Sequence, residues 1–216
     1  MDLTVKRMSA ELAADYFDFF DNRAFSDDSP FYPCYCDAFQ MTEKQIHAEF
    51  FEQMEKNGGG KEGLRISIRK SAERMVAQNI IQGYLAYDNG VSVGWCNAND
   101  RANYVRVGEF NPARKSGYYI ADEAEGSEKI KSIVCFEIAP SHRGMGVASA
   151  LLDRVCEDAK KDGYDKVEVY PVARQDYEPL DFTGPVHMYE KAGFVRVAQR
   201  GNMLIMQKDL RQHDNQ

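Results

Sequence analysis

The stretch of sequence that decides the fold is Arg143-Gly144-Met145-Gly146-Val147-Ala148. It follows a predicted strand over 130–138, which is rich in apolar and β-forming residues, and it feeds a predicted helix over 147–161. The first amides of a helix have no partner inside the helix, and the helix dipole favours negative charge there. Two glycines let the backbone close around an anion. The stretch therefore predicts a phosphate-binding turn.

Hydrophobic periodicity places the elements around this turn. The helix over 147–161 has an apolar face at helical spacing, made of Ala148, Leu151, Leu152, Val155 and Ala159. The pattern downstream predicts a strand, a helix and two strands over Lys166–Tyr170, Pro185–Lys191, Phe194–Val197 and Met203–Gln207. The strand–helix–strand unit predicts a parallel strand pair with a right-handed crossover, and Gly201-Asn202 predicts a final antiparallel hairpin.

The first half of the chain mixes helices and strands. Periodicity predicts strands over Leu3–Lys6, Tyr84–Tyr87 and Val91–Cys96, and helices over Ala10–Phe20, Glu43–Lys56 and Ile66–Gln78. Thr42 and Gln45 predict a capping box for the second helix, and glycines 58–60 interrupt the chain after it. Residues 97–129 are polar and predict a long loop or insertion.

Composition narrows the class of protein. The 216 residues are 44% hydrophobic, which is enough for one domain with a sizeable core. The net charge of -7 argues against a nucleic-acid partner. No apolar run approaches the ~20 residues of a membrane helix, so no membrane partner is expected.

Targeting signals and cysteines predict the location. Met1-Asp2-Leu3-Thr4 lacks the apolar segment of a signal peptide. The five scattered cysteines indicate free thiols in a reducing compartment, so a cytoplasmic location is expected. Cys34-Tyr35-Cys36 has no second Cys/His pair at a ligand spacing, so no metal is expected.

Aromatic residues crowd the chain between Tyr16 and Phe51. One interpretation is a helical layer packed over a sheet, and another is the wall of a substrate pocket. Both interpretations can hold at once. The residues concerned are Tyr16, Phe17, Phe19, Phe20, Phe25, Phe31, Tyr32, Tyr35, Phe39, Phe50 and Phe51.

The identity of the phosphate ligand follows from what surrounds the turn. A nucleoside-triphosphate loop is excluded, because no Lys-Ser/Thr follows the glycines. Gly144-x-Gly146-x-x-Ser149, with Glu168 on the next strand, nearly matches a dinucleotide site. Against it stand the serine in place of the third glycine, the long connection over 139–142, and the short chain that follows. The other candidate is the diphosphate of coenzyme A.

Two motifs resemble those of the GNAT superfamily of N-acyltransferases. Ile138-Ala139-Pro140 followed by Arg143-x-x-Gly146-x-Ala148 is similar to its acetyl-CoA motif. Residues 188–194, Met-Tyr-Glu-Lys-Ala-Gly-Phe, are similar to its Tyr-x-x-x-Gly-Phe closing motif. The resemblance covers roughly 80–207 and implies an α/β fold. Its central sheet would be mixed and mostly antiparallel, with a parallel strand pair at the acetyl-CoA site and helices on both faces.

The resemblance also implies a domain plan and a way of holding acetyl-CoA. It implies one N-acetyltransferase domain over 1–216, with a variable helical part at 1–60 and a catalytic core at 80–207. Acetyl-CoA would be the co-substrate, with no metal. Its diphosphate would bind the turn residues Arg143, Gly144, Met145, Gly146, Val147 and Ala148. Its pantetheine would pair along Phe136 and Ile138, where the strand diverges from the one ending at Tyr170.

The chemistry implied is direct attack of a neutral amine on the thioester. The Ile138 amide would stabilise the oxyanion, and Tyr189 would give a proton to the leaving thiolate. For the general base the sequence leaves Glu137, Glu168 and His187 open, with Glu137 as first choice. Tyr189 and Glu137 are therefore the expected catalytic residues.

One position departs from the family pattern. Where many members carry an asparagine that contacts the cofactor, this chain has Phe182. The neighbouring Tyr177, Asp176, Glu178 and Asp181 are candidates to face the substrate instead.

The expected function is transfer of an acetyl group from acetyl-CoA to a primary amine of a small molecule or peptide. A non-catalytic CoA-binding module and a nicotinamide-dependent oxidoreductase are the alternatives. The sequence names neither the acceptor nor the oligomeric state, and a homodimer stays open.

Overall fold

The computed structural model describes residues 2–27, 29, 31–110, 117–120, 128–173 and 182–211. A seven-stranded sheet of order β1-β2-β3-β6-β7-β9-β8 lies at its centre, and β4 pairs with β5 in a separate hairpin. Within the large sheet only β6 and β7 run parallel, so the mixed, mostly antiparallel sheet is confirmed. The strands are β1 (Leu3–Arg7), β2 (Gly83–Asp88), β3 (Val91–Asp100), β4 (Arg106–Phe110), β5 (Gly117–Ile120), β6 (Ile130–Ile138), β7 (Lys166–Val169), β8 (Val195–Arg200) and β9 (Met203–Asp209).

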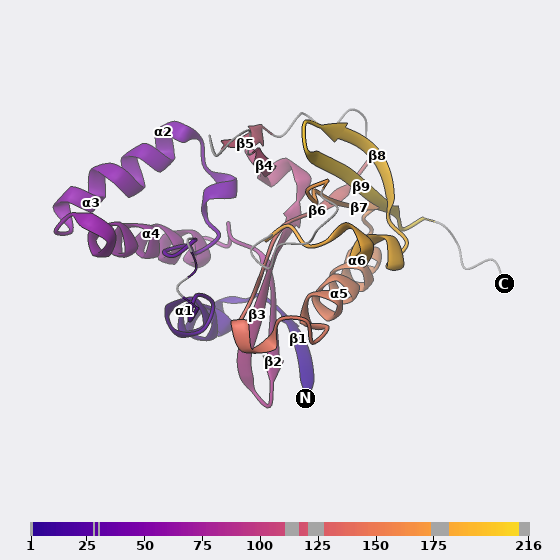
Figure 1. The fold of residues 1–216 in the computed structure, drawn as a ribbon, viewed down its shortest axis with the longest axis horizontal. Helices are drawn as coiled ribbons and strands as arrows, with labels where there is room; N and C mark the ends of the chain where they lie inside the picture. The colour runs from indigo at the N-terminus through magenta and orange to yellow at the C-terminus, as the bar shows by residue number, and fades with distance from the viewer. Residues whose placement is uncertain are drawn as a thin grey trace.

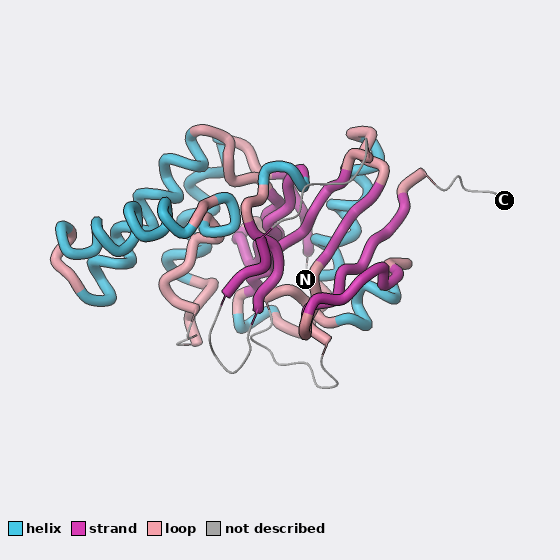
Figure 2. Tube along the Cα trace, turned by 90° about the horizontal axis from the view of Figure 1, so that it is seen from above, coloured by secondary structure: helices cyan, strands magenta, loops and turns pink. Residues whose placement is uncertain are grey.

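Helices cover both faces of the sheet, as the sequence predicted (Figures 1 and 2). On one face lie α1 and α4, with α2 and α3 beyond them, and on the other lie α5 and α6. The helices are α1 (Ala13–Asn22), α2 (Glu43–Ile46), α3 (Glu52–Lys56), α4 (Gly60–Ala77), α5 (Val147–Lys161) and α6 (Val186–Lys191). A π-helical segment, His47–Phe51, joins α2 to α3, and short 3-10 turns lie at Ala10–Leu12, Ala38–Gln40, Arg101–Asn103 and Pro140–His142.

Side chains alternate along β2 between two separate apolar clusters. Leu85 and Tyr87 are buried with α1 and α4, while Tyr84 and Ala86 are buried with α5. This period of two is what a strand buried on both faces requires. Trp95 of β3 is fully buried on the α1 side, and its ring centroid lies 4.8 Å from that of Tyr16. The aromatic residues of α1 thus form the packed layer that the sequence predicted.

A glycine of β3 brings the start of α5 against the sheet. A Cβ atom added at Gly94 would lie 2.9 Å from Val147 Cγ1 and 3.0 Å from Ile138 Cδ1. Both distances are too short for an ordinary contact, so any larger residue would push α5 outward. Gly94 therefore fixes how closely the helix N-terminus approaches the end of β6.

The sequence placed the start of α4 incorrectly. The helix begins at Gly60, not Ile66, although the capping box of Thr42 and Gln45 on α2 is confirmed. Gly59 adopts a φ of +71° that ends the preceding turn, so the glycines reverse the chain without preventing the next helix. A Cβ at Gly63 would lie 2.6 Å from the Met54 carbonyl oxygen. This glycine permits close packing of α4 on α3, a role that its helix propensity conceals.

The interpretation of 97–129 as one loop was also wrong. β3 continues to Asp100 and pairs with β6, and β4 and β5 form a hairpin within the same stretch. Polar residues enter the sheet because their groups are satisfied. Asn97 Nδ2 donates to the Cys36 carbonyl at 2.8 Å, and Asn99 Nδ2 donates to the Ile80 carbonyl at 3.1 Å. Composition alone cannot show that such partners exist.

Candidate active site

The parallel pair β6–β7 opens halfway along β6. The two strands are in register from Ile130 opposite Lys166 to Ile133 opposite Val169. Beyond that point β6 stays paired with β3. The chain after β7 instead follows β9, where the Leu204 amide donates to the Pro171 carbonyl at 2.8 Å. The predicted divergence is present, and it exposes one edge of β6 to a cavity.

Backbone groups of β6 point into this opened edge. The Ala139 amide donates to the Val93 carbonyl at 2.9 Å, so this pair is hydrogen-bonded across β3 and β6. Hydrogen-bonded and non-hydrogen-bonded pairs alternate along an antiparallel ladder. Ile138 and Phe136 therefore direct their amides and carbonyls away from β3. The Ile138 amide faces the position that the sequence assigned to an oxyanion.

Two protein groups already meet this edge. The Phe136 amide donates to the Phe182 carbonyl at 2.6 Å, and the Ile138 carbonyl accepts from Arg143 Nε at 3.2 Å. Phe182, which departs from the family pattern, thus uses its backbone oxygen to cap one position along β6. A ligand that pairs along the whole edge must displace this contact, whereas the Ile138 amide can be reached without doing so.

The glycine turn adopts the conformation that an anion site needs. Gly144 and Gly146 have φ values of +74° and +86°, and Gly146 caps the 15-residue helix α5. A Cβ added at either glycine would meet no atom within 4 Å. These glycines are therefore required by the left-handed backbone and not by crowding, and open space lies before the helix N-terminus. The Met145 side chain projects outward and is 49% exposed.

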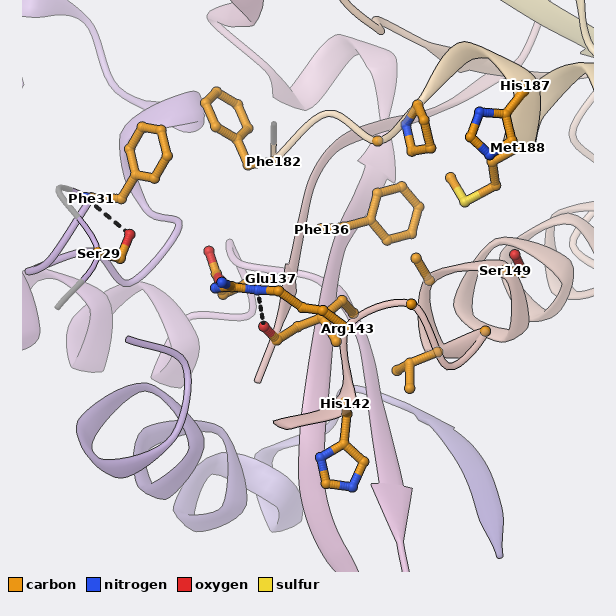
Figure 3. Close-up of a pocket in the computed structure, with 17 residues that line it drawn as sticks. Ser29, Phe31, Phe136, Glu137, His142, Arg143, Ser149, Phe182, His187 and Met188 are labelled. Carbon is orange, nitrogen blue, oxygen red and sulfur yellow. Dashed lines mark hydrogen bonds and ion pairs between the residues drawn. The ribbon is translucent and has the colours of Figure 1, made fainter. Parts of the chain in front are cut away.

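A cavity of about 370 Å³ joins the turn to the opened edge (Figure 3). Most of the predicted cofactor-binding residues line it together. They are Phe136, Ile138, Arg143, Gly144, Gly146, Val147 and Ala148, with Glu137 beside them. Figure 3 shows Glu137 and Arg143 turned toward Ser29 and Phe31, while the Phe136 ring turns toward Met188. Met145, also predicted, does not line this cavity.

Glu137 lies in an unusual environment for a carboxylate. Its side chain is 12% exposed, and Arg143 Nη2 lies 3.7 Å from its Oε1. Burial raises the pKa of Glu137 to about 8, and the Arg143 guanidinium offsets only part of that rise. Arg143 also pairs with Asp27, so its charge is directed at two carboxylates. The backbone of the turn, more than this guanidinium, is available to a diphosphate.

Tyr189 lies behind the cavity wall. It is 1% exposed and packs edge to face with Phe194, with ring centroids 5.6 Å apart. Its hydroxyl donates to the Thr183 carbonyl. A Cβ at Gly184, which lines the cavity, would lie 2.9 Å from that hydroxyl. The phenol therefore lies close behind Gly184, next to Met188, whose Cε would lie 2.9 Å from the same Cβ.

The other two candidate bases lie in different surroundings. Glu168 is buried away from the cavity, where it accepts from Arg101 Nε at 3.0 Å and from Gln207 Nε2 at 2.6 Å. These partners make it a structural carboxylate of β7. His187 is exposed at the rim of the cavity. The candidates Asp176, Tyr177, Glu178 and Asp181 lie outside the described residues.

Sequence reasoning missed the far wall of the cavity. Ser29, Phe31 and the nearby Asp27 come from the chain after α1, more than a hundred residues before the turn. The crowding of aromatic residues was their only signal. Among the residues that the structure describes, no group of three or more His, Cys, Asp or Glu could hold a metal ion. All five cysteines are free thiols, and no described helix is both long and apolar enough to cross a membrane.

Solved structures share this fold at low sequence identity. YncA of Salmonella typhimurium, a putative acetyltransferase with its cofactor acetyl-CoA, aligns with a TM-score of 0.50 and 14% identity. The alignment covers 99% of this chain and 97% of that one. The NatC complex bound to Gag peptide and CoA aligns with a TM-score of 0.52 and 10% identity, covering 97% and 99%. No curated protein sequence matches the chain.

A family model shows the relationship directly. The model described as the acetyltransferase (GNAT) family matches residues 44–194. The match includes the glycine turn and Tyr189, and it begins before α3, well upstream of the motifs found by inspection. It covers more than half of the sequence. This chain belongs to the GNAT family of acetyltransferases.

Proposed function

We propose that this acetyltransferase moves an acetyl group from acetyl-CoA to a primary amine by direct attack. The carrying observation is that the opened edge of β6 and the N-terminus of α5 meet in one cavity. The edge supplies backbone partners for the amides of pantetheine, and the turn supplies amides for a diphosphate. Residues 1–216 act as one domain in this proposal.

The residues present fit acetyl-CoA in three respects. Gly144 and Gly146 open the backbone toward the anion, and no Cβ blocks the approach. Gly94 holds the helix N-terminus against the end of β6, so both parts of the cofactor have protein partners. The Ile138 amide is directed away from β3 at the opened edge, where it would donate to the thioester oxygen as charge develops on it. In comparable sites such a donor contributes roughly 2.7–4 kcal/mol to the transition state.

Glu137 is the proposed general base. The pKa of Glu137, about 8, lies much closer to that of an alkylammonium, about 10, than the pKa of an ordinary glutamate does. Proton transfer from the ammonium to Glu137 is therefore less unfavourable. Glu137 takes one proton from the ammonium, and the freed nitrogen forms a bond to the acetyl carbon. The carbon–sulfur bond then breaks, and the sulfur keeps the electron pair.

Tyr189 is the proposed donor to the departing sulfur. Its hydroxyl lies just behind Gly184, and its present acceptor is the Thr183 carbonyl. To donate to the sulfur, the hydroxyl must leave the Thr183 carbonyl and move past Gly184 and the Met188 side chain, which lies beside the same glycine. This assignment completes the proton balance, because one proton leaves the amine and one reaches the thiolate.

A thiol-release assay tests the function. Purified protein is incubated with acetyl-CoA and a panel of primary amines, and both free CoA and acetylated amine are quantified. The proposal predicts equal amounts of both products with at least one amine. Saturable acetyl-CoA binding with no turnover on any amine would make the chain a binding module. Thermal protection by NAD(P) and none by CoA would favour an oxidoreductase.

A further inference from the structure

A second cavity lies on the other side of Glu137. It has a volume of about 200 Å³ and is formed by the chain before α2, by α4 and by β6. Glu137, Phe31 and Phe182 line both cavities, so the two spaces meet at these side chains. An amine in the second cavity can therefore reach the same carboxyl that faces the first.

The wall of this second cavity is largely apolar, and four of its lining residues are phenylalanines. Phe31, Phe39 and Phe50 come from the stretch 31–50, and Phe182 comes from the chain just before α6. The Phe182 ring lies edge-on to Phe31 and to Phe39, with ring centroids 5.5 Å and 6.2 Å apart. These rings give the cavity an apolar wall on which an alkyl chain would pack.

Asp37 is, with Glu137, one of two carboxyl groups in this largely apolar wall. The residue is 1% exposed and lines the second cavity but not the first. Its Oδ2 has no hydrogen-bond partner among the described residues. Against the larger effect of burial, the side chains of Ser71 and Arg74 both lower the pKa of Asp37. Each of them is also engaged by Glu49: the Ser71 hydroxyl donates to Glu49 Oε2 at 3.0 Å, and Arg74 is ion-paired with it. A buried carboxyl oxygen without a partner is costly, and a ligand that donates to it removes that cost.

The two carboxyls of the second cavity therefore have different surroundings. Glu137 lines both cavities, beside the expected thioester, whereas Asp37 lines the second cavity alone. One amine nitrogen at Glu137 would react. A second positively charged group would donate to Asp37 Oδ2, and apolar walls lie along the same cavity.

We infer that the second cavity binds an acceptor with two cationic ends, a small diamine. Its reacting nitrogen lies at Glu137, its second ammonium pairs with Asp37, and its alkyl spacer packs on the phenylalanine rings. This inference rests on the proposed N-acetyltransferase function and names the substrate class of that site. Burial raises the pKa of Asp37 to about 7, and an entering ammonium would lower it, which favours binding of the charged form.

A matched series of amines tests the inference. The substrates are 1,5-diaminopentane, n-pentylamine, which lacks the second charge, and 6-aminohexanoate, which reverses it. The wild type should use the diamine with a kcat/KM at least about tenfold above that of n-pentylamine, with 6-aminohexanoate lowest. Equal use of diamine and monoamine, or preference for 6-aminohexanoate, would overturn the inference and leave the acetyltransferase function intact.

The variant Asp37→Asn sharpens the test. It should lower kcat/KM for 1,5-diaminopentane about tenfold or more and leave n-pentylamine within about twofold. The monoamine reports whether the variant is folded and active. Asp153→Asn, which neutralises an exposed aspartate on α5, should change neither value. An equal loss on both amines in Asp37→Asn would reduce this residue to a structural role.

Direct binding separates the two proposals. Calorimetric titration of 1,5-diaminopentane into protein saturated with CoA should show binding that Asp37→Asn weakens. Such binding without turnover on any amine would sustain the diamine site and contradict the acetyltransferase mechanism. Turnover of other amines, without any binding of a diamine from three to seven carbons, would sustain the acetyltransferase function and contradict the diamine site.

Discussion

The two cavities that meet at Glu137 are built in opposite ways. The first takes most of its residues from one continuous stretch, 136–149, and its chemistry lies largely in backbone amides. The second takes side chains from 31–39, Phe50, Ile68, β6 and Phe182. The difference teaches that a phosphate and pantetheine site can be encoded locally by glycines and a helix start. Recognition of the acceptor requires side chains that only the fold brings together.

The sharpest way to break the first cavity alone is Gly146→Glu. The residue has a φ of +86°, and the new carboxylate would lie at the α5 N-terminus where the anion is expected. Acetyl-CoA affinity should fall at least about 100-fold, as measured by calorimetry. The control is Gly90→Glu, which places the same strain and charge in the β2–β3 turn, at a φ of +81°. Equal affinities in the two variants would remove the turn from cofactor binding.

Glu137→Gln acts at the junction of the cavities. It should lower kcat by about 100-fold, the usual scale for loss of a general base. Because the pKa of Glu137 is about 8 and only its deprotonated form accepts a proton, the wild-type kcat/KM should rise with pH through about 8. The variant should lack that rise, whereas the exposed control Glu157→Gln should keep it. An unchanged pH profile in Glu137→Gln would assign the base elsewhere.

Tyr189→Phe separates a proton donor from a packing residue. We expect turnover to fall about tenfold with little change in acetyl-CoA affinity, because the ring stays and only the hydroxyl is lost. Losing the bond to the Thr183 carbonyl should also cost about 1 kcal/mol of stability. Tyr16→Phe is a matched control, since that buried hydroxyl donates to the Tyr35 carbonyl on the other face of the sheet. If each of the two variants lost stability but kept the turnover of the wild type, Tyr189 would have no role in the chemistry.

The smallest expected effect concerns stability at the second cavity. Asp37 has a folded pKa of about 7, above the roughly 3.9 of an unfolded aspartate. Below pH ~4 both states hold the proton. As pH rises from ~4 to 7 the unfolded state loses it first, so wild-type stability falls. The stability of Asp37→Asn should therefore match that of the wild type near pH 4 and exceed it at pH 8. Each kcal/mol of difference in stability should raise the Tm of the variant by about 2–4 °C.

The exposed Asp153 provides the control for that comparison. Asp153→Asn should show the same Tm difference from the wild type at both pH values, because an exposed carboxylate is not desolvated on folding. A Tm difference for Asp37→Asn that does not grow between pH 4 and pH 8 would contradict the raised pKa of Asp37. The second cavity would then lack its buried anion.

Local patterns predicted those elements that carry their own start and stop signals. β6 and α5 have the predicted bounds because an apolar strand, a proline, a glycine turn and an amphipathic helix follow one another without interruption. α4 and the end of β3 were misplaced because Gly63 and Asn97 act through tertiary contacts, with Met54 of the preceding helix and with the distant Cys36. Glycine and asparagine have low propensity for helices and strands, so the sequence predicts that an element ends at them unless their tertiary contacts are known.

The sequence by itself determined the anion-binding turn, the amphipathic helix behind it and, through two motifs, the acetyltransferase family. These features depend on backbone conformation and on residues within a few positions of each other. Only the tertiary structure decided that Glu137 is desolvated beside Arg143, that Tyr189 lies behind Gly184, and that the buried Asp37 has no hydrogen-bond partner at its Oδ2. The physical reason is that burial and electrostatic coupling depend on which distant segments enclose a side chain.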